Sequence, residues 1–567
     1  MKILNLHVDY IKFKPLKKAL KRIAELSEHE KKQKEVKEAL VVFTAVEKSD
    51  ADVKRVVENL VKNIKEIAEQ VKTKNIVLYP YAHLSSDLGS PDLAVKVLDE
   101  AEKELKKSFK VTRTPFGYYK EFEMKVKGHP LSELSREIKV GGKEDSEKYN
   151  PKQLLREISK SKLDSSKLKP NDHRILGQQM DLFSFNETAP GMVFWHNNGL
   201  IIYNEMIKFW REVHKKAGYQ EILTPQILDK RLWQISGHWE KYKENIFLTD
   251  YNKRAFAIKP MNCPGGMLIF KNSPKSYKDL PLKVAELGIV HRQELSGVLG
   301  GLFRVVQFTQ DDAHIYCTEN QIEKEIENAL DLLGLIYNKF NFKIDHVELS
   351  TRPEKRIGTD KEWDKSEKVL EDVLKRKKMK FKINPGDGAF YGPKIDFHVK
   401  DSLGRTWQCG TFQLDFAMPE RFNLEYTDKN NKKKSPVMIH RTIYGSLERF
   451  LGILLESTNG RLPTWLAPVQ VRILSFTDRN TEYGEKILGI LKENIPELRI
   501  DSDFRSTTVS TKVKEAEIMR VPYIIVVGDK EEKENTLAVR IRGDKKIEKM
   551  SLEEFSEKLK GEISERE

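Results

Sequence analysis

The sequence predicts a multidomain protein of mixed α/β and α+β architecture. A chain of 567 residues is too long for a single hydrophobic core. Helix and strand patterns alternate at both ends of the chain, which is typical of α/β domains. Between residues 141 and 170 the chain turns polar, as expected of a linker. We therefore expect four segments: a first domain over 1–143, a linker with a short helix over 144–171, a central domain over 172–467 and a last domain over 468–567.

The first domain is predicted to be a small α/β module. Apolar side chains recur at helical spacing over residues 53–71 and again over 93–105. A strand over 76–79 separates the two helices, and strands resume around Val111 and over 118–126. Helices that alternate with strands in this way indicate helices packed on a sheet.

The last domain is predicted to repeat this alternation. Pro463 and Pro468 separate it from the central domain. Beyond them a strand, two helices and a further strand are expected at 471–476, 483–494, 511–519 and 523–527.

Composition narrows the class of protein without deciding the function. The formal net charge of +14 favours polyanionic partners, nucleic acid first, although a lysine-rich surface explains it equally well. The three cysteines are an odd number and widely scattered, which argues against a disulfide framework and for a reducing, cytoplasmic compartment. No apolar run is long enough to span a bilayer, and the N-terminus lacks a signal cleavage site. We expect a cytoplasmic protein with no membrane partner.

A polar stripe on one strand of the central domain indicates a binding site. If residues 304–314 form a strand, Gln310, Asp312 and His314 project from one face, because side chains two residues apart share a face. Polar groups on one face of an otherwise apolar strand cost desolvation free energy unless a ligand or partner binds them. An exposed edge of the sheet is the alternative explanation.

Arginines on either side of a glycine-rich loop indicate a polyphosphate site. Arg292 and Glu294 are predicted to share a strand face, and a loop over 296–301 leads to Arg304 on the second arm of a hairpin. Planar guanidinium groups match phosphate oxygens. The sequence has no GxxxxGK[ST] loop, so an ATP site here is not of the P-loop kind.

A third segment places Arg449 between two glycines. If residues 444–452 are helical, Gly445 and Gly452 lie on either side of Arg449 at the i−4 and i+3 positions. Glycine is costly inside a helix, so these two residues either clear space for a ligand or allow a close helix crossing.

These three segments resemble the motifs of class II aminoacyl-tRNA synthetases. In that family the first motif is a helix and strand ending in proline, matched here by residues 207–225; the arginine hairpin and the Gly-Arg helix are the second and third. The resemblance narrows to the threonyl-tRNA synthetases and covers nearly the whole chain after residue 172. It rests on the stretches DHRILGQQMDLF, PMNCPGG, VQFTQDDAH, AFYGPKIDF, WQCGTFQLDF and HRTIYGSLERF.

The resemblance implies a fold and an activity. The central domain would be an antiparallel sheet with helices, flanked by an N-terminal α/β editing domain and a C-terminal α/β anticodon-binding domain. The enzyme would use ATP with magnesium to join threonine to tRNA(Thr). Members of this group are usually homodimers with the first motif at the interface.

The resemblance also assigns roles to individual residues. For ATP it implies Arg292 at the α-phosphate, Glu294 at the adenine amino group, and Arg304 with Arg449 at the γ-phosphate. Other residues match those lining the family's substrate site: Lys394 as a catalytic residue, Gln408 and Thr411 for ATP, and Met261, Gln310, Asp312, Tyr391 and Gln413 for threonine. Strand parity lets Gln408 share a pocket with Thr411 and Gln413 only through a bulge, for which Gly410 is a natural place.

One zinc per chain is implied by the match of Cys263, His314 and His440 to the family's ligands. Each residue alone also fits an ordinary buried or surface position. Cys263 precedes Pro-Gly-Gly at a predicted helix start, where the helix dipole favours thiolate. Three protein ligands leave a coordination position open. In the family, zinc binds the amino and hydroxyl groups of threonine and Asp312 accepts the hydroxyl hydrogen, which rejects the nearly isosteric valine.

Serine shares that hydroxyl and lacks only a methyl group. The threonine-binding site would therefore discriminate against serine by only about 10–200-fold, which calls for a second site that hydrolyses mischarged tRNA. Residues 1–143 resemble the N-terminal editing domain of archaeal-type members, which is similar to D-aminoacyl-tRNA deacylases. The matching stretches are MKILNLHVDY, YPYAHLSS, PFGYYK and HPLSE. By this resemblance His83, Tyr119, Lys120 and Glu133 would orient water and substrate. Lys120 on an apolar strand face is alternatively a snorkelling side chain at a strand end.

In the last domain, Arg540 and Arg542 alternate on a predicted strand, so both could point at anticodon bases. Two arginines on a solvated face are the ordinary alternative. Two rival functions remain open: a related class II enzyme such as a seryl- or prolyl-tRNA synthetase, and a non-catalytic paralogue that only binds tRNA. The metal-ligand set argues against the first rival, and the retained phosphate-binding arginines argue against the second.

Overall fold

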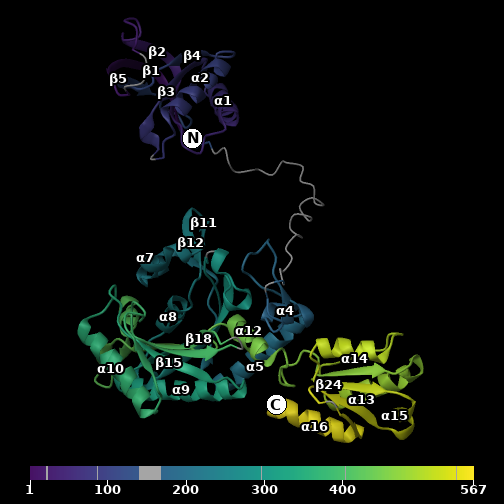
Figure 1. Cartoon of the computed structure of the whole chain (residues 1–567). Helices are drawn as coiled ribbons and strands as arrows, with labels where there is room; N and C mark the ends of the chain where they lie inside the picture. Colours follow the sequence, from purple (N-terminus) through teal and green to yellow (C-terminus); the bar gives the residue numbers. More distant parts are fainter. Residues whose placement is uncertain are drawn as a thin grey trace. The chain divides into compact units, whose positions relative to one another are not determined.

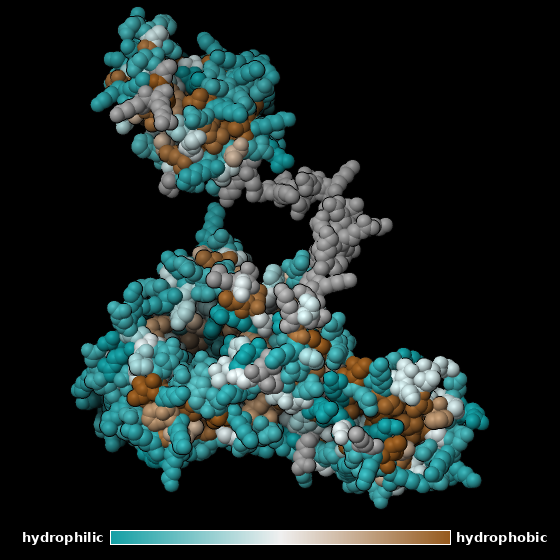
Figure 2. All heavy atoms as spheres, in the orientation of Figure 1, coloured by the Kyte–Doolittle hydropathy of each residue, from teal (hydrophilic) through white to brown (hydrophobic). Residues whose placement is uncertain are grey.

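The computed structural model describes residues 1–138, 166 and 168–566, apart from residues 21, 22, 24, 86, 295, 402, 403 and 545. It divides the chain into two compact units, Met1–Pro151 and Lys152–Glu567 (Figure 1). The helix predicted within the linker lies outside the described residues. The face seen in Figure 2 is mainly hydrophilic. No helix in the described ranges is long and apolar enough to cross a membrane.

The first unit is a mixed sheet with two helices on one face. The strand order is β4-β3-β2-β1-β5, and β6 also pairs with β1. Apolar side chains of both helices pack with Ile3, Leu40 and Ile76 in one core. The helices fall where the apolar spacing predicts them. The bounds are β1 Lys2–Lys18, β2 Lys34–Ala45, α1 Val53–Gln70, β3 Asn75–Pro80, η1 Ala82–Leu84, α2 Pro91–Leu105, β4 Lys110–Arg113, β5 Tyr118–Val126 and β6 Glu133–Glu137.

Strand β5 curls over the second face of this sheet. The ring of Phe122 on β5 lies 5.9 Å from that of Phe43 on β2 and 5.5 Å from that of Tyr79 on β3. The pairing of β1 with β5 is irregular near Pro15, which is consistent with the bend. The curl brings Lys120 of β5 next to Tyr79, with Nζ 5.0 Å from the ring centroid.

The core of the second unit is a mainly antiparallel sheet with the order β16-β15-β17-β18-β21-β14-β13-β9. Helices α5, α9 and α12 share a large apolar core with one face of this sheet. Helix α8 packs on the opposite face, against Tyr316 and Met438 (Figure 1). The predicted antiparallel core is confirmed.

The sheet strands are β9 Gln220–Glu221, β13 Leu282–His291, β14 Gln307–Cys317, β15 Ile344–Ser350, β16 Lys382–Asn384, β17 Lys394–Lys400, β18 Thr406–Asp415 and β21 Val437–Thr442. The main helices are α5 Asn197–Lys216, α8 Cys263–Lys271, α9 Ile322–Lys339, α10 Asp360–Arg376 and α12 Leu447–Thr458. Smaller elements are α4 His173–Gln179, β7 Phe183–Ser184, β8 Phe194–Trp195, β10 Ile227–Asp229, α6 Lys230–Ile235, α7 His238–Tyr242, β11 Leu248–Tyr251, β12 Arg254–Ile258, α11 Ala417–Arg421, β19 Tyr426–Thr427 and β20 Lys433–Lys434.

The arginine hairpin is present, but its strands are shorter than predicted. Strand β13 ends at His291, so Arg292 and Glu294 lie beyond it, and Arg304 precedes β14. The short turns η4 (Ser296–Val298) and η5 (Gly301–Phe303) take the connecting residues out of the ladder. The predictions that Arg292 and Glu294 share a strand face, and that residues 304–306 belong to a strand, were therefore wrong.

The last domain has the strand order β23-β22-β24-β25-β26 with helices at the predicted places. It contacts the central domain through Arg499, whose Nη1 lies 3.2 Å from the Glu205 carboxylate and whose Nη2 donates to the Trp465 carbonyl. The bounds are β22 Val471–Ser475, α13 Thr481–Asn494, β23 Ile500–Asp503, α14 Val509–Ile518, β24 Tyr523–Val527, α15 Asp529–Glu534, β25 Leu537–Ile541, β26 Ile547–Met550 and α16 Leu552–Glu565.

Candidate active site

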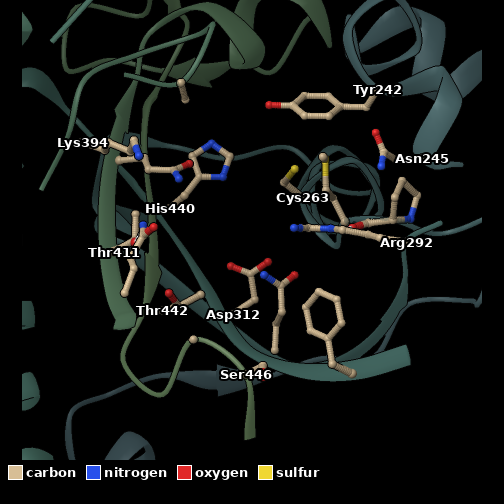
Figure 3. A pocket seen from close by; sticks show the side chains of 18 of the residues that line it. Tyr242, Asn245, Cys263, Arg292, Asp312, Lys394, Thr411, His440, Thr442 and Ser446 are labelled. Carbon is tan, nitrogen blue, oxygen red and sulfur yellow. Dashed lines mark hydrogen bonds between the residues drawn. The ribbon is translucent and has the colours of Figure 1, made fainter. Parts of the chain in front are cut away.

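One cavity of about 690 Å³ lies on the α8 side of the central sheet (Figure 3). It brings together residues that are separated by up to 211 positions along the chain, from His238 to Arg449. Every predicted central-domain site residue except His314 lines it: Met261, Cys263, Arg292, Glu294, Arg304, Gln310, Asp312, Tyr391, Lys394, Gln408, Thr411, Gln413, His440 and Arg449.

The polar stripe on β14 has the predicted orientation. Gln310 and Asp312 line the cavity, and His314 is buried beside them with Nε2 3.8 Å from the Asp312 carboxylate. Ala313 and Ile315 point into the core on the other face. The exposed-edge alternative is wrong, because β14 lies between β13 and β21.

Arg292 and Arg449 line the cavity as cations without a carboxylate partner. Arg292 Nε donates to the Pro260 carbonyl at 3.1 Å, and its guanidinium lies 5.2 Å from the Phe308 ring. Arg449 donates through Nε to the Phe303 carbonyl and through Nη1 to that of Gln408. Desolvation lowers the pKa of both groups. Neither makes an ion pair among the residues that the structure describes, so both are available to an anion.

Arg304 is held differently. Its guanidinium is half-exposed and bonds the Glu294 carboxylate, with Nη2 at 2.9 Å and Nε at 3.1 Å from Oε2. An ion pair this exposed contributes little stability. A ligand that binds Arg304 or Glu294 must break this ion pair. Because the pair contributes little stability, breaking it costs little free energy.

The glycines around Arg449 have separate roles. Gly445 lies before α12, with φ of +78°, so the prediction that it is helical at i−4 was wrong. The turn that contains Gly445 is held by two hydrogen bonds, in which the backbone N–H groups of Ile443 and Gly445 donate to the buried Asp311 carboxylate. Gly452 is helical, and a Cβ there would lie 3.1 Å from the Phe303 ring. A close packing contact, the second of the two explanations, therefore accounts for Gly452.

A bulge in β18 lets its polar side chains share the cavity. Phe397 pairs with Gly410 and His398 with Gln408, so Cys409 is the extra residue, one position before the predicted Gly410. Gln408 Nε2 then donates to Thr411 Oγ1 at 2.7 Å and to Asp396 Oδ1 at 2.5 Å. The predicted bulge is confirmed, displaced by one residue.

Lys394 is paired with two carboxylates. Its Nζ lies 2.9 Å from Asp387 Oδ2 and 2.8 Å from Asp396 Oδ2. Burial lowers the pKa of Lys394, but the attraction of Asp396 and Asp387 outweighs that effect and the net pKa is raised. The ammonium group is therefore charged and ready to contact an anionic ligand at the cavity wall.

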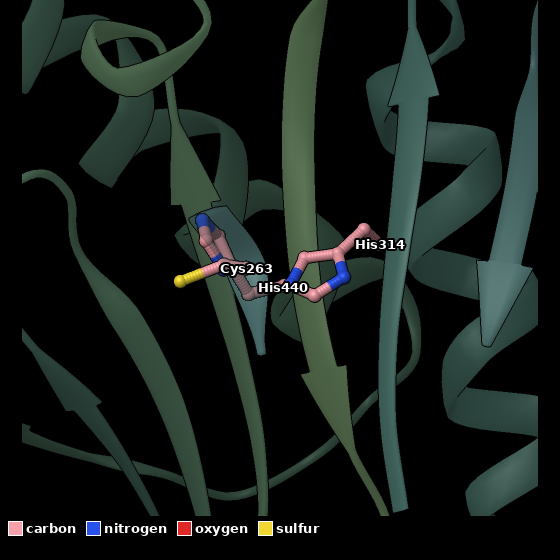
Figure 4. Close-up of side chains that lie close together, drawn as sticks. All are labelled: Cys263, His314 and His440. Atoms are coloured by element: carbon pink, nitrogen blue, oxygen red, sulfur yellow. The ribbon is translucent and has the colours of Figure 1, made fainter. Parts of the chain in front are cut away.

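Cys263, His314 and His440 form a group that can hold a metal ion (Figure 4). His314 and His440 are direct cross-strand partners on β14 and β21, and Cys263 begins α8 above them. All three are buried, and their ligand atoms lie within 4.8 Å of one another. Among the residues that the structure describes, His314 Nε2 has no hydrogen-bond partner, which is costly for a buried nitrogen unless it binds something. The donor set suits zinc.

Protonation of these ligands is set by burial. Desolvation raises the pKa of the Cys263 thiol, and the nearby Asp312 and Asp415 carboxylates raise it further. The expected effect of the helix dipole is therefore outweighed, and a bound cation is needed to keep the thiolate. Desolvation lowers the pKa of His314 to about 4, which leaves a neutral imidazole.

Asp415 is a residue beside the Cys263 group that sequence reasoning missed. Its Oδ2 lies 2.9 Å from His440 Nε2, and its Oδ1 accepts the backbone N–H groups of Ala417 and Met418. A carboxylate behind a histidine ligand fixes which ring nitrogen faces the metal. Tyr391 completes the arrangement, stacking on His440 at 5.0 Å and donating its hydroxyl to Gln413. The only signal was the position of Asp415 within the stretch WQCGTFQLDF.

In the first unit, Lys120 lies against one ring of an aromatic cluster, that of Tyr79. Its Nζ donates to the carbonyls of Pro115 and Tyr118, and desolvation lowers its pKa to about 8. The ring centroid of Tyr81 lies 6.2 Å from that of Tyr79 and 5.3 Å from that of His83. The structure thus brings Lys120 and His83 to one side of the module.

The other two predicted editing residues are more exposed. Tyr119 points away from the core and is 64% exposed. Glu133 is exposed on β6, opposite Leu6 of β1. Within the described part of the module, neither makes a hydrogen bond or ion pair with Lys120 or His83.

The two predicted anticodon residues differ in the structure. Arg542 donates to the carbonyls of Arg520 and Leu462 and is held inside the unit, where desolvation lowers its pKa to about 10. The prediction that Arg542 alternates with Arg540 on a strand was wrong, because Arg542 lies beyond the end of β25 and joins the two domains. Arg540 lies on β25 and is partly exposed.

Three family models match successive parts of the chain. Residues 1–138 match the "Archaea-specific editing domain of threonyl-tRNA synthetase". Residues 242–458 match the "tRNA synthetase class II core domain (G, H, P, S and T)", and residues 470–562 match the "Anticodon binding domain".

The crystal structure of the RNA binding domain of threonyl-tRNA synthetase from Cryptosporidium parvum Iowa II is 40% identical, with a TM-score of 0.66 over 69% of this chain and 98% of that one. The chain belongs to the threonyl-tRNA synthetase family. The threonine–tRNA ligase of Clostridium botulinum strain 657 is 53% identical over 395 residues, which is 70% of this chain. The chain spans 62% of the length of that curated relative. Prolyl-tRNA synthetase of Giardia lamblia, at 19% identity and a TM-score of 0.56, shares the fold.

The turn before α12 generates a first prediction. A Cβ at position 445 would lie 2.4 Å from the Cys409 carbonyl oxygen, and the positive φ is unfavourable for alanine. We expect Gly445→Ala to lower the free energy of unfolding by about 2 kcal/mol or more. The matched control is Gly334→Ala within α9, where nothing lies within 4 Å of the added Cβ. The control should raise stability by up to about 1 kcal/mol. Equal denaturation midpoints for the two variants would contradict the strained turn.

Proposed function

We propose that the chain is a threonine–tRNA ligase that activates threonine with ATP and transfers it to tRNA(Thr). The observation that carries this proposal is the pair of partly buried guanidinium groups, Arg292 and Arg449, that line one cavity without carboxylate partners. A cavity that presents uncompensated cations beside a Cys-His-His group suits a polyphosphate next to a metal-bound small molecule. Family membership supports the same activity.

In the activation step, a threonine carboxylate oxygen attacks the α-phosphorus of ATP and pyrophosphate leaves. Arg292 contacts the α-phosphate and stabilises the charge that develops there. Arg304 and Arg449 bind the γ-phosphate, after Arg304 releases Glu294, which then accepts from the adenine amino group. Lys394, Gln408 and Thr411 line the wall where the nucleotide lies, and magnesium accompanies the phosphates as in the family. A ribose hydroxyl of the tRNA then attacks the carbonyl carbon of the adenylate, and AMP leaves.

Selection of threonine rests on the buried polar groups around Asp312. Cys263, His314 and His440 would hold one zinc, which when bound supplies a Lewis acid for the amino and hydroxyl groups of threonine. The Asp312 carboxylate accepts the hydroxyl hydrogen, and Gln310, Met261, Tyr391 and Gln413 line the rest of the pocket. Valine leaves these polar groups unpaired, which a site of this kind rejects strongly.

The first unit is proposed to hydrolyse seryl-tRNA(Thr). Lys120, beside Tyr79, Tyr81 and His83, supplies a cation at the edge of an aromatic cluster where an RNA end can stack. His83 and Lys120 would orient water and substrate, with Tyr119 and Glu133 added by the resemblance.

The remaining partners follow from the other domain and from exposed apolar side chains. The last domain would bind the anticodon arm of tRNA(Thr), with Arg540 as the arginine that stays available.

A homodimer through the first motif is supported by Leu223, 76% exposed, and Ile227, 52% exposed, next to β9. The three cysteines are free and buried, which supports a cytoplasmic, reducing compartment. The domain boundaries that we propose are those predicted from the sequence.

Amino-acid-dependent ATP–pyrophosphate exchange tests the central activity. We expect exchange with threonine, a weaker signal with serine and almost none with valine. A related seryl- or prolyl-specific enzyme would prefer another amino acid, and a tRNA-binding paralogue would give no exchange.

The metal centre generates the second prediction. Purified protein should retain about one tightly bound zinc per chain. Cys263→Ala, His314→Ala and His440→Ala should each lose that zinc and abolish threonine activation, because each removes one of three ligands. Metal analysis and pyrophosphate exchange on the same samples measure both effects. Full activity of a metal-free preparation would refute the role of zinc.

The third prediction concerns Arg449. Arg449→Ala should lower adenylate formation by about two to three orders of magnitude, since it removes a charged donor that stabilises the phosphates. Binding of tRNA should stay nearly unchanged. The control Arg461→Ala removes an exposed arginine outside the cavity lining and should leave exchange intact. Lost tRNA affinity with normal exchange would place the ATP site elsewhere.

The fourth prediction concerns editing. Removal of residues 1–143 should spare threonine activation and let seryl-tRNA accumulate. The isolated first unit should hydrolyse preformed seryl-tRNA faster than threonyl-tRNA, because the extra methyl must be turned away. Lys120→Met keeps the apolar stem and should lose part of this activity, whereas Lys125→Met on the same strand, an exposed lysine paired with Asp9, should not. Equal decay of both aminoacyl-tRNAs would leave the unit as a tRNA-binding appendage.

The same Lys120→Met variant reports on burial of the ammonium group. The pKa of about 8 in the folded unit is below the ordinary lysine value of 10.5, so between these pH values the unfolded chain binds more protons than the folded one. The stability of the wild-type unit should therefore rise relative to the variant as pH rises from 8 to 10.5. Thermal unfolding of both proteins at each pH measures this difference, which also shows that the variant folds.

A further inference from the structure

Two histidines and one glutamate form a second cluster on the central sheet, outside the Cys263 group. His346 and Glu348 project from the same face of β15, and His398 of β17 is the direct cross-strand partner of His346. The side chains are 24, 23 and 18% exposed in that order, so each is sheltered but reachable from solvent. Their ligand atoms all lie within 4.8 Å of one another.

The nitrogen atoms of this cluster face the carboxylate. His346 Nε2 lies 3.5 Å from Glu348 Oε1, and His398 Nε2 lies 3.8 Å from Glu348 Oε2. The two imidazole rings stack, with centroids 4.3 Å apart and planes only 9° from parallel. Two imidazoles and one carboxylate are a donor set for divalent transition metals.

Outer partners hold these side chains in a ligating orientation. Asp345 Oδ2 lies 2.7 Å from His346 Nδ1, and Lys400 pairs with the other oxygen of Asp345 at 2.7 Å. Asp345 therefore accepts the Nδ1 hydrogen and leaves the Nε2 lone pair facing His398 and Glu348. Asn384 Nδ2 donates to Glu348 Oε2 at 2.9 Å. A carboxylate that orients a histidine in this way is typical of metal sites.

We propose that His346, Glu348 and His398 bind a second divalent metal ion, for which zinc is the natural probe. Around a tetrahedral zinc the ligand atoms are separated by about 3.3 Å, given bonds of about 2.0–2.1 Å. The two nitrogen–oxygen distances, 3.5 and 3.8 Å, are close to that value, and a rotation of the nearly parallel imidazole rings would bring both Nε2 atoms to one ion. A fourth position remains for water.

The second site is separate from the Cys263 group. The sheet order β15-β17-β18-β21-β14 places two strand spacings between β17 and β21, roughly 10 Å. One ion therefore cannot serve both sets. The second set also lacks a thiolate, so it binds zinc more weakly than the first.

The position of the second site defines its role. Lys394 and Asp396 share the strand face of His398 on β17, and Lys394 lines the cavity. A metal that joins β15 to β17 clamps the strand that carries these residues. The site is thus structural: a bound metal ion should raise the free energy of unfolding of the central domain.

The test is a zinc titration of the chelator-stripped full-length protein. We expect two equivalents per chain at saturation, the second weaker. His398→Gln and Glu348→Gln should each bind one, and Cys263→Ser should lose the first equivalent and keep the second. Asp345→Asn should weaken the second site by about 10–100-fold without removing it. His29→Gln, an exposed histidine in the first unit, is the matched control and should bind two.

Two further readouts separate the sites. With Co²⁺ in place of zinc, thiolate charge-transfer absorption should come only from the Cys263 group. In Cys263→Ser the thermal unfolding midpoint should still rise with zinc, and this rise should vanish when His398→Gln is added. The proposal is overturned if the wild-type protein saturates at one equivalent. It is equally overturned if a second equivalent persists in both His398→Gln and Glu348→Gln, which would mark nonspecific binding.

Discussion

The antiparallel pairing of β14 with β21 is the constraint on which the site depends. It sets His314 directly opposite His440 and, by alternation, turns Asp312 to the same face. On the other face the same register turns Ala313, Ile315 and Ile439 into the core. A shift of one residue would bury the polar face and expose the apolar one, so the hydrophobic core and the candidate metal centre fix each other.

A second constraint is the scarcity of counter-charge around the cavity arginines. Arg292 and Arg449 are held by backbone carbonyls, which orient a guanidinium group without neutralising it. Arg304 and Lys394, by contrast, are paired with carboxylates. An anionic ligand in this cavity would therefore meet two guanidinium groups that make no ion pair among the described residues, and two cations that must first release a carboxylate.

The sheet of the central domain carries two kinds of histidine cluster under the same physical rule. In each, histidines face one another across neighbouring strands, and a carboxylate behind one ring, Asp415 for His440 and Asp345 for His346, selects the nitrogen that points into the group. Burial is complete around Cys263 and partial around His398. The two groups should therefore differ in their affinity for a metal ion and in how easily an ion reaches them from solvent.

Periodicity within the sequence by itself determined the helices of the outer domains and the shared face of Gln310, Asp312 and His314, because these depend only on neighbours along the chain. Resemblance to a family assigned Cys263 and His440, which no local spacing connects to His314. Only the tertiary structure decided the positions of Arg292 beyond β13, the displaced bulge at Cys409 and the capture of Arg542 by two carbonyls. It alone revealed Asp311, Asp415 and the His346 cluster, since each depends on cross-strand register or on contacts between segments far apart in sequence.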